Sequence, residues 1–272
     1  MPDDEPVRVA LPARFGEAAR RFAESGAEPV IPRVAATVVL LRSASAGFEV
    51  YSLRRASTMV FAPNMYAFPG GSVDVRDAEV EVGWAGPSPE WWAGRLGMEA
   101  AAARAVVCAA VREVFEECGV LLAGPNESTV VGDVSGVDWE AARLALLARE
   151  VGLAELLTRR GLVVRSDLLV PWARWLTPEF EPRRFDAFFF LARLPADQRT
   201  RDVGGEAEHT VWASPAELAA LPMLPPTAYT LRELSVLDDV DAAMAAGAGR
   251  DLTTPVRQRF QSSDDGAWLI VG

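Results

Sequence analysis

The amino-acid sequence predicts a mixed fold, α+β or an α/β/α sandwich, in which helices cover a mixed β-sheet. Three features favour it: β-branched or alternating apolar runs at 35–42 and 48–55, an alanine-rich, proline-free segment at 98–119, and a late apolar run at 184–194. The apolar runs are typical of strands, and the alanine-rich segment is typical of a helix. Because strands and helices do not alternate regularly, an all-parallel sheet is not expected.

The first third of the chain predicts a lead-in followed by a hairpin. Residues 1–33 contain five prolines and predict a loose segment with one short helix near 15–24. The runs 35–42 and 48–55 flank a Ser/Gly-rich turn, which predicts a β-hairpin. Residues 65–71 end in Pro-Gly-Gly and predict a break in regular structure.

The remaining elements follow from local patterns. Residues 78–97 contain three tryptophans among glycines and prolines and have no clear period. The helix predicted at 98–119 ends at Gly119, a residue suited to follow a helix C-terminus. Further expected elements are a strand within 119–123, one or two amphipathic helices at 138–161, a strand at 208–214, a Ser-capped short helix at 214–218 and helix at 228–248.

Composition excludes several classes of function. The 272 residues suggest one domain or two small ones, and the net charge is -11, which argues against a non-specific nucleic-acid binder. All 27 basic residues are arginine, so a Walker-type phosphate loop and Schiff-base lysine chemistry are excluded. The single histidine, His209, excludes a His-rich zinc site, and no G-x-S-x-G motif is present.

The two cysteines and the chain ends indicate a reduced, cytoplasmic protein. Cys108 and Cys118 fall on one predicted helix about 15 Å apart, too far for a disulfide. The N-terminal residues are acidic where a signal peptide would be basic, and the last residues are not a peroxisomal address. No apolar run is long enough for a membrane span, so no membrane association is expected.

The segment 112–120, REVFEECGV, carries the candidate chemistry. Three glutamates at i, i+3 and i+4 share one helix face, while apolar residues lie opposite and are expected to pack into the core: Val107, Val111, Val114 and Cys118. Crowded carboxylates repel one another near a helix C-terminus, whereas Mg²⁺ or Mn²⁺ would offset that repulsion. Arg112 can pair with Glu116 four residues later. The alternative is a solvated acidic face with an ordinary surface ion pair.

This order of residues resembles the second half of the Nudix box, G-x5-E-x7-R-E-U-x-E-E-x-G-U, where U is apolar. Every fixed position of that half matches: Arg112, Glu113, Val114, Glu116, Glu117, Gly119 and Val120. The first half departs. FPGG at 68–71 makes Gly71 the box glycine, but six residues later stands Asp77, and eight residues before Arg112 stands Arg104. The two halves are too far apart, which indicates an insertion.

The interrupted box is itself similar to a narrower group, the Nudix proteins that resemble peroxisomal coenzyme A diphosphatases. These carry FPGG-x-x-D before a helix like this one, and the segment 171–195 resembles a strand of that group. The resemblance covers about 34–220. It implies a Nudix α/β/α sandwich with a mixed sheet and extra C-terminal helices. The implied divisions are a lead-in at 1–33, a Nudix domain at 34–220 with an insertion at about 78–103, and a C-terminal helical extension at 221–272.

The resemblance implies a metal-dependent diphosphatase that cleaves the P–O–P bond of a nucleoside diphosphate linked to another moiety, with coenzyme A or acyl-coenzyme A preferred. Magnesium or manganese would be held by Glu113, Glu116, Glu117 and the Gly70 carbonyl, with Arg112 orienting the carboxylates. A further carboxylate from a late loop would be Glu206 or Glu208. Candidates for binding substrate phosphates are two arginine pairs, Arg54 with Arg55 and Arg183 with Arg184.

Several alternatives remain open at this point. The substrate could instead be ADP-ribose, a dinucleotide or a nucleotide sugar, or the chain could be a non-catalytic Nudix nucleotide sensor. Trp84, Trp91 and Trp92 could form a lid or could pack the insertion, and His209 could be an acid–base group or structural. Nudix enzymes often dimerise, so a homodimer is an open expectation.

Overall fold

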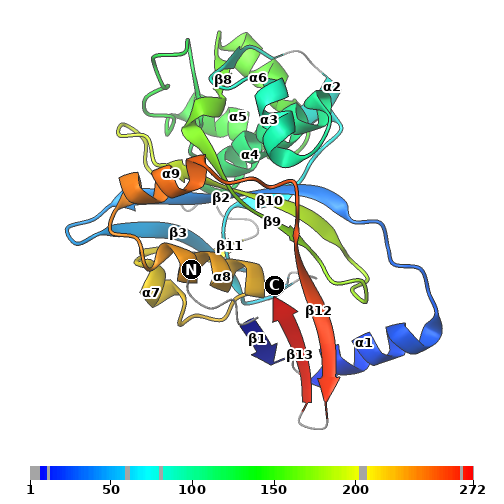
Figure 1. Ribbon diagram of the computed structural model, residues 1–272. Helices are drawn as coiled ribbons and strands as arrows, with labels where there is room; N and C mark the ends of the chain where they lie inside the picture. Colours follow the sequence, from blue (N-terminus) through cyan, green and yellow to red (C-terminus); the bar gives the residue numbers. More distant parts are fainter. Residues whose placement is uncertain are drawn as a thin grey trace.

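The computed structural model describes residues 7–10, 13–58, 62–79, 82–201, 207–263 and 266–271 (Figure 1). Their main feature is a long sheet. Its strands run in the order β1 (Val7–Ala10), β13 (Gly266–Val271), β12 (Val256–Ser263), β9 (Leu169–Leu176), β10 (Phe185–Arg193), β2 (Arg33–Ser43), β3 (Phe48–Arg55) and β11 (Ala207–Ala213). The predicted hairpin corresponds to β2 and β3, and the predicted late strands correspond to β10 and β11.

The sheet is mixed, as the sequence predicts. β10 is parallel to β2 and antiparallel to β9, and β2 is antiparallel to β3. A parallel pair needs a long crossover, which here contains the helices between β2 and β10. The apolar run of β2 is buried because both faces of the sheet are covered.

Helices cover the two faces, and alternate residues of β2 belong to different cores. Ala36, Val38 and Leu40 pack in one cluster, whereas Val39 and Leu41 pack in the other. The first cluster lies under α3 (Pro89–Leu96), α4 (Ala100–Cys118), α5 (Val137–Leu147) and α6 (Leu153–Arg159). The second lies under α7 (Pro215–Leu218), α8 (Pro225–Leu234) and α9 (Val240–Ala248). The α/β/α sandwich is therefore confirmed (Figure 1).

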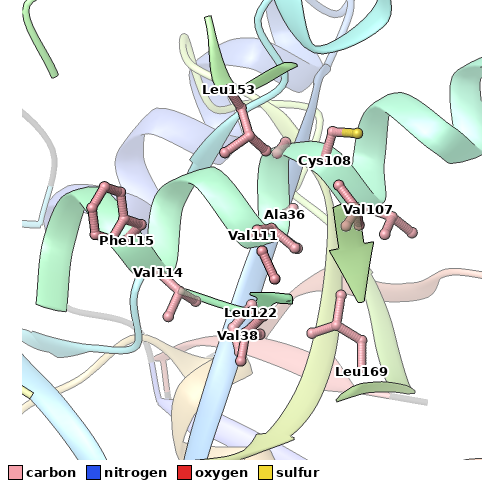
Figure 2. Packing of buried hydrophobic residues seen from close by; sticks show 14 of the residues in the cluster. Ala36, Val38, Val107, Cys108, Val111, Val114, Phe115, Leu122, Leu153 and Leu169 are labelled. Carbon is pink, nitrogen blue, oxygen red and sulfur yellow. The ribbon is translucent and has the colours of Figure 1, made fainter. Parts of the chain in front are cut away.

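The predicted helix at 98–119 is α4, and its apolar face packs on β2 as expected. Val107, Val111 and Val114 are fully buried in the same cluster as Val38 (Figure 2). The helix ends at Gly119, whose φ of 69° is left-handed. Both cysteines are buried and free in the described part of the chain, and burial raises the pKa of Cys108 to about 12. These thiols are core residues.

The insertion packs against the core instead of forming an open loop. It follows the short helix α2 (Arg76–Glu79) and contains β6 (Trp84–Ala85) and α3, whose N-cap Ser88 accepts a hydrogen bond from the Trp91 amide. Trp92 is fully buried, with its ring 5.6 Å from that of Phe190 on β10. Trp92 is thus a packing residue and not a lid, while Trp91 is 39% exposed.

The strand expected within 119–123 is much shorter than predicted. Only β7 (Ala123–Gly124) forms, and it pairs with β8 (Val163–Arg165). The side-chain amide of Gln198 explains the difference: it accepts from the Leu121 amide at 2.8 Å and donates to the Leu121 carbonyl at 3.0 Å. A buried glutamine therefore replaces the neighbouring strand for Leu121.

The chain ends also differ from the expectation. The lead-in contains the short helix α1 (Ala13–Ser25) as predicted, but also β1, which pairs with β13 near the other end of the chain. The extension expected to be helical at 221–272 contains α8 and α9 but continues into the hairpin β12–β13. The helix expected at 228–248 is two helices, because Asp239 caps the start of α9. The domain boundaries stay predictions.

None of the helices in the described ranges is both long enough and apolar enough to cross a bilayer.

Candidate active site on the box helix

The two halves of the interrupted box meet in space. β5 (Gly70–Ser72) pairs with β2, while β4 (Tyr66–Ala67) pairs with β3, so the glycine loop lies between the two strands of the hairpin. A Cβ atom on Gly71 would lie 2.4 Å from an Oε atom of Glu113. Glycine is therefore needed for this loop to approach the carboxylates of α4 so closely.

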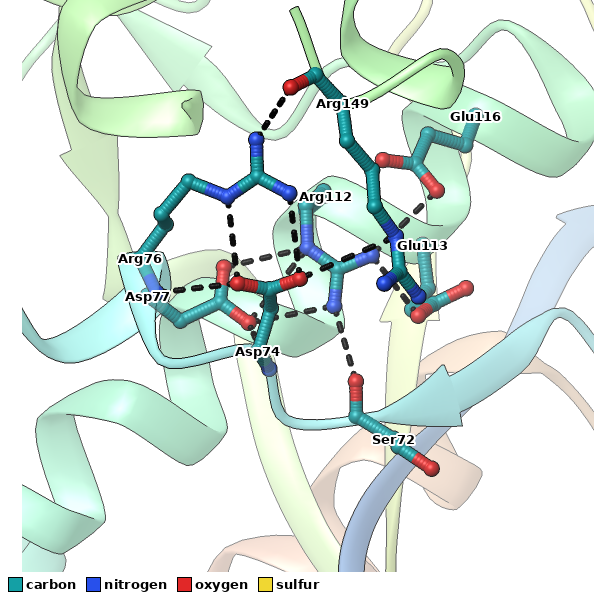
Figure 3. Close-up of polar contacts among 8 residues, drawn as sticks. All are labelled: Ser72, Asp74, Arg76, Asp77, Arg112, Glu113, Glu116 and Arg149. Carbon is teal, nitrogen blue, oxygen red and sulfur yellow. Dashed lines mark hydrogen bonds and ion pairs between the residues drawn. The ribbon is translucent and has the colours of Figure 1, made fainter. Parts of the chain in front are cut away.

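Arg112 is at the centre of the site (Figure 3). Its Nε donates to Asp77 Oδ1 at 3.0 Å, and its Nη1 donates to Glu113 Oε1 at 2.8 Å and Glu116 Oε2 at 3.2 Å. Its Nη2 donates to the Ser72 carbonyl at 2.9 Å. The predicted pairing of Arg112 with Glu116 is confirmed. The pair is buried, which rules out the solvated-face alternative.

Asp77 occupies the role that the box glutamate would have. Its side chain is only 1% exposed, and it is the carboxylate partner of Arg112 that comes from outside α4. The short helix α2 carries Asp77 to this position before the insertion begins. The sequence marks Asp77 only as a departure from the box, whereas the structure makes it part of the site.

Burial sets the electrostatics of the carboxylates. Burial raises the pKa of Glu113 to about 7, although the charge of Arg112 opposes the shift. Burial also raises the pKa of Glu116. Hydrogen bonds from Arg76 instead lower the pKa of Asp74, the acidic residue of the FPGG-x-x-D segment. The buried glutamates therefore lack part of the solvation that a carboxylate needs.

Glu117 points to the glycine loop. The Gly70 amide donates to Glu117 Oε2 at 2.9 Å, so the glycine and glutamate predicted to share a cation are in contact. Within the described residues, no three carboxylate, thiol or imidazole side chains are gathered closely enough to enclose a metal ion. The donors nevertheless suit a hard cation, because they are carboxylate oxygens in excess of the nearby positive charge. Binding would require Glu113 and Glu116 to exchange contacts with Arg112 for contacts with the cation.

A second set of side chains fixes the C-terminal end of α4. Arg143, which is fully buried on α5, donates to the Glu116 carbonyl at 2.8 Å and to Glu140 at 2.6 Å. Arg201 also pairs with Glu140, and its backbone amide donates to the Cys118 carbonyl. Cationic groups near the last carbonyls of a helix interact favourably with the negative end of the helix dipole. Sequence reasoning missed these residues, because they come from separate segments of the chain.

The predicted arginine pairs have different surroundings. Arg54 donates to Asn64, and in the sheet it lies opposite His209, which is exposed. Arg184 is buried and donates to the backbone carbonyls of Thr177 and Val30, away from the carboxylates of α4. It lines a cavity of about 600 Å³ beside α1 that none of the box residues lines.

The other two predicted arginines and the two predicted late-loop glutamates lie as follows. Arg55 pairs with Ala207 across β3 and β11, and Arg183 is exposed. The structure thus places Arg54 and Arg55 at the end of β3, between β4 and β11, but it does not bring Arg184 to the box. Glu206 lies outside the described residues. Glu208 lies in β11 at an irregularity of the strand, and its side chain is outside the described part.

A mixed sheet, a glycine loop and a carboxylate-bearing helix together define a Nudix hydrolase fold, and comparison with known proteins agrees. A family model described as the NUDT19 Nudix domain matches residues 94–234. This match spans more than half of the chain, which therefore belongs to the NUDT19 Nudix domain family.

Relatives and solved structures support this assignment. Nudix hydrolase 7 of Caenorhabditis elegans is 29% identical over 77% of this chain and 62% of its own length. The acyl-coenzyme A diphosphatase NUDT19 of Gallus gallus is 28% identical over 62% of this chain and 55% of its own length. The chain thus spans less than two thirds of these relatives. The crystal structure of a Nudix hydrolase from Alicyclobacillus acidocaldarius has a TM-score of 0.65 and 27% identity, covering 83% of this chain and 99% of that one.

The raised pKa of Glu113 gives a testable pH dependence. In the unfolded chain this carboxyl titrates near 4.5 and in the folded, cation-free protein near 7, so the folded state holds the extra proton in between. The stabilisation of the folded state by this proton is fully present below the pKa of Glu113 in the unfolded chain, and it is lost as pH rises through about 7. We expect the melting temperature of cation-free wild type to fall between about pH 5 and pH 8. Glu113→Gln should flatten that decline.

The control is Glu99→Gln at the exposed start of the same helix, which should retain the decline. Calorimetric melting in a chelator measures all three proteins. If Glu113→Gln and the control melt with the same pH profile as wild type, the buried carboxyl does not hold that proton.

Proposed function

We propose that this protein hydrolyses the P–O–P bond of coenzyme A or acyl-coenzyme A in a reaction that depends on Mg²⁺ or Mn²⁺. The observation that carries the proposal is the buried cluster of carboxylates on α4, closed by Arg112 and Asp77 and adjoining the glycine loop. The family of the chain and its similarity to the chicken acyl-coenzyme A diphosphatase NUDT19 support the substrate class.

In the proposed reaction, water attacks one phosphorus of the pyrophosphate and the bridging P–O bond breaks. The products are an adenosine bisphosphate and a phosphopantetheine. When bound, divalent cations supply neutralisation of the phosphate oxygens and polarisation of the reacting group. Glu113, Glu116 and Glu117 would hold them with the Gly70 carbonyl, and one glutamate would accept the proton of the water. Arg112 orients the carboxylates of Glu113 and Glu116.

The interrupted box favours coenzyme A over other pyrophosphates. In this chain Asp77, a buried partner of Arg112, lies directly before the insertion, and the insertion itself supplies α3, which packs against the core. ADP-ribose, dinucleotides and nucleotide sugars carry the same P–O–P group, so they form the second candidate class. The three intact glutamates disfavour a non-catalytic sensor.

The test is a product assay. The protein is incubated with Mg²⁺ or Mn²⁺ and, separately, with coenzyme A, ADP-ribose, NADH and diadenosine polyphosphates, and the products are separated by chromatography. We expect coenzyme A to yield an adenosine bisphosphate and a phosphopantetheine only when the cation is present. Efficient cleavage of another compound with coenzyme A intact would contradict the substrate assignment. Binding without turnover of any compound would indicate a sensor.

A further inference from the structure

The turn between α5 and α6 holds an arginine in an unusual backbone conformation. Arg149 has a φ of 59°, in the left-handed region that favours glycine. Its amide donates to the Leu146 carbonyl at 2.9 Å, and its carbonyl accepts from Arg76 Nη1 at 2.5 Å. The backbone of Arg149 is therefore fixed from both sides. A turn that needed only this conformation would be better served by glycine.

The side chain of Arg149 reaches from this turn into the carboxylate cluster of the box (Figure 3). Its Nε lies 3.8 Å from Asp74 Oδ2, close enough for attraction between the charges but too far for a hydrogen bond. Its charge also acts on the carboxylate of Glu116. The turn between α5 and α6 thus contributes a positive group beside the site on α4.

Three arginines meet at this cluster, and they differ in their freedom to reach a ligand. The side chain of Arg112 is 11% exposed and donates to four acceptors, and that of Arg76 is 32% exposed and is bound to Asp74 and to the Arg149 carbonyl. The side chain of Arg149 is 76% exposed, and its ion pair with Asp74 is long. A long, exposed pair of this kind contributes little to stability.

A guanidinium beside carboxylates that are expected to bind Mg²⁺ or Mn²⁺ weakens their affinity for those ions. Its position is explained if the guanidinium binds an anionic ligand. We propose that Arg149 binds a phosphate group of the pyrophosphate substrate at this site. Guanidinium groups match phosphate oxygens in charge and geometry. The proposal rests on the proposed function only in taking a pyrophosphate compound as the ligand; it does not depend on coenzyme A being that compound.

The test uses Arg149→Gly and Arg149→Gln, with Arg149→Lys as the conservative variant. The matched control is Arg159→Gln, which removes the same charge from an exposed arginine of the neighbouring helix α6 that pairs with Glu155. Binding of inorganic pyrophosphate in the presence of Mg²⁺ is measured by isothermal titration calorimetry. KM and kcat for the pyrophosphate compound that the protein cleaves, and the melting temperature, are measured separately.

We expect both neutral variants to bind pyrophosphate at least about tenfold more weakly. Losing a hydrogen bond to a charged group typically weakens binding by about this factor. KM should rise by a similar factor with kcat nearly unchanged. Arg149→Lys should recover part of the affinity, and Arg159→Gln should match wild type. Arg149→Gly should melt no lower than wild type, since glycine suits the left-handed turn. This separates lost binding from lost folding.

Unchanged pyrophosphate affinity and KM in both neutral variants would overturn the proposal, as would a wild type that binds no pyrophosphate. A gain in Mg²⁺ affinity without any loss of pyrophosphate affinity would also overturn it, because Arg149 would then only screen the carboxylates. If wild type cleaves another pyrophosphate compound and not coenzyme A, the proposed substrate fails. The Arg149 variants would still be decided with inorganic pyrophosphate.

Discussion

Glu117→Gln should reduce kcat by about three orders of magnitude while leaving the fold intact, since a metal ligand supplies several kcal/mol of transition-state stabilisation. The side-chain oxygen of glutamine can still accept the 2.9 Å hydrogen bond from the Gly70 amide, so the loop should keep its place. What is lost is the negative charge that attracts the cation. Steady-state kinetics with saturating Mg²⁺ or Mn²⁺ measure the effect.

The control for this prediction is again Glu99→Gln, because Glu99 precedes α4 and its side chain makes no capping hydrogen bond among the described residues. This variant should retain wild-type kcat. Near-normal turnover by Glu117→Gln would remove Glu117 from the proposed cation site and would leave Glu113 and Glu116 as the remaining ligands.

Arg112→Met should destabilise the cation-free protein by about 3–5 kcal/mol, the typical cost of removing one partner from a buried ion pair. Methionine approximates the volume of the arginine stem, but it leaves Asp77, Glu113 and Glu116 without their shared guanidinium. Carboxylates buried without a counter-charge are unfavourable. Urea denaturation in a chelator, followed by circular dichroism, gives the change in the free energy of unfolding.

Arg42→Met is the matched control for Arg112→Met, since Arg42 pairs with Glu49 near the surface. A pair of this exposure contributes at most about 1 kcal/mol, so the control should unfold close to wild type. Equal, small losses in both variants would mean that the Arg112 network adds little to stability. Its role would then be restricted to orienting the carboxylates.

The parts of this fold that depend on local pattern are predictable from the sequence. α4 is predicted because its valines recur on one face, and β2 and β3 because two apolar runs flank a turn. By contrast, β1 has only four residues, and its partner β13 is near the opposite end of the chain. No local pattern specifies such a pairing, because its stability comes from the sheet it joins.

The site residues also divide into those that local sequence predicts and those that only the fold brings together. The carboxylates of α4 are predictable because a single helix brings them together. Asp77, Arg143 and Arg149 are not, because they come from three other segments: α2, α5 and the turn after α5. The first two bind groups of α4, and Arg149 lies beside Asp74. The sequence does contain one signal for Asp77, its place six residues after Gly71, where the box has glutamate. Arg184 shows the opposite error, since an arginine next to a strand was expected at the substrate and instead binds backbone carbonyls.

The central claim is that the glutamates of α4 hold a divalent cation that in turn binds pyrophosphate. The most direct measurement is the anomalous scattering of crystals soaked in Mn²⁺. We expect a manganese peak bound by carboxylate oxygens of α4 next to Gly70, with Glu113 or Glu116 released from Arg112. Well-ordered crystals of active protein with no manganese there, and with these side chains still bound to Arg112, would contradict it.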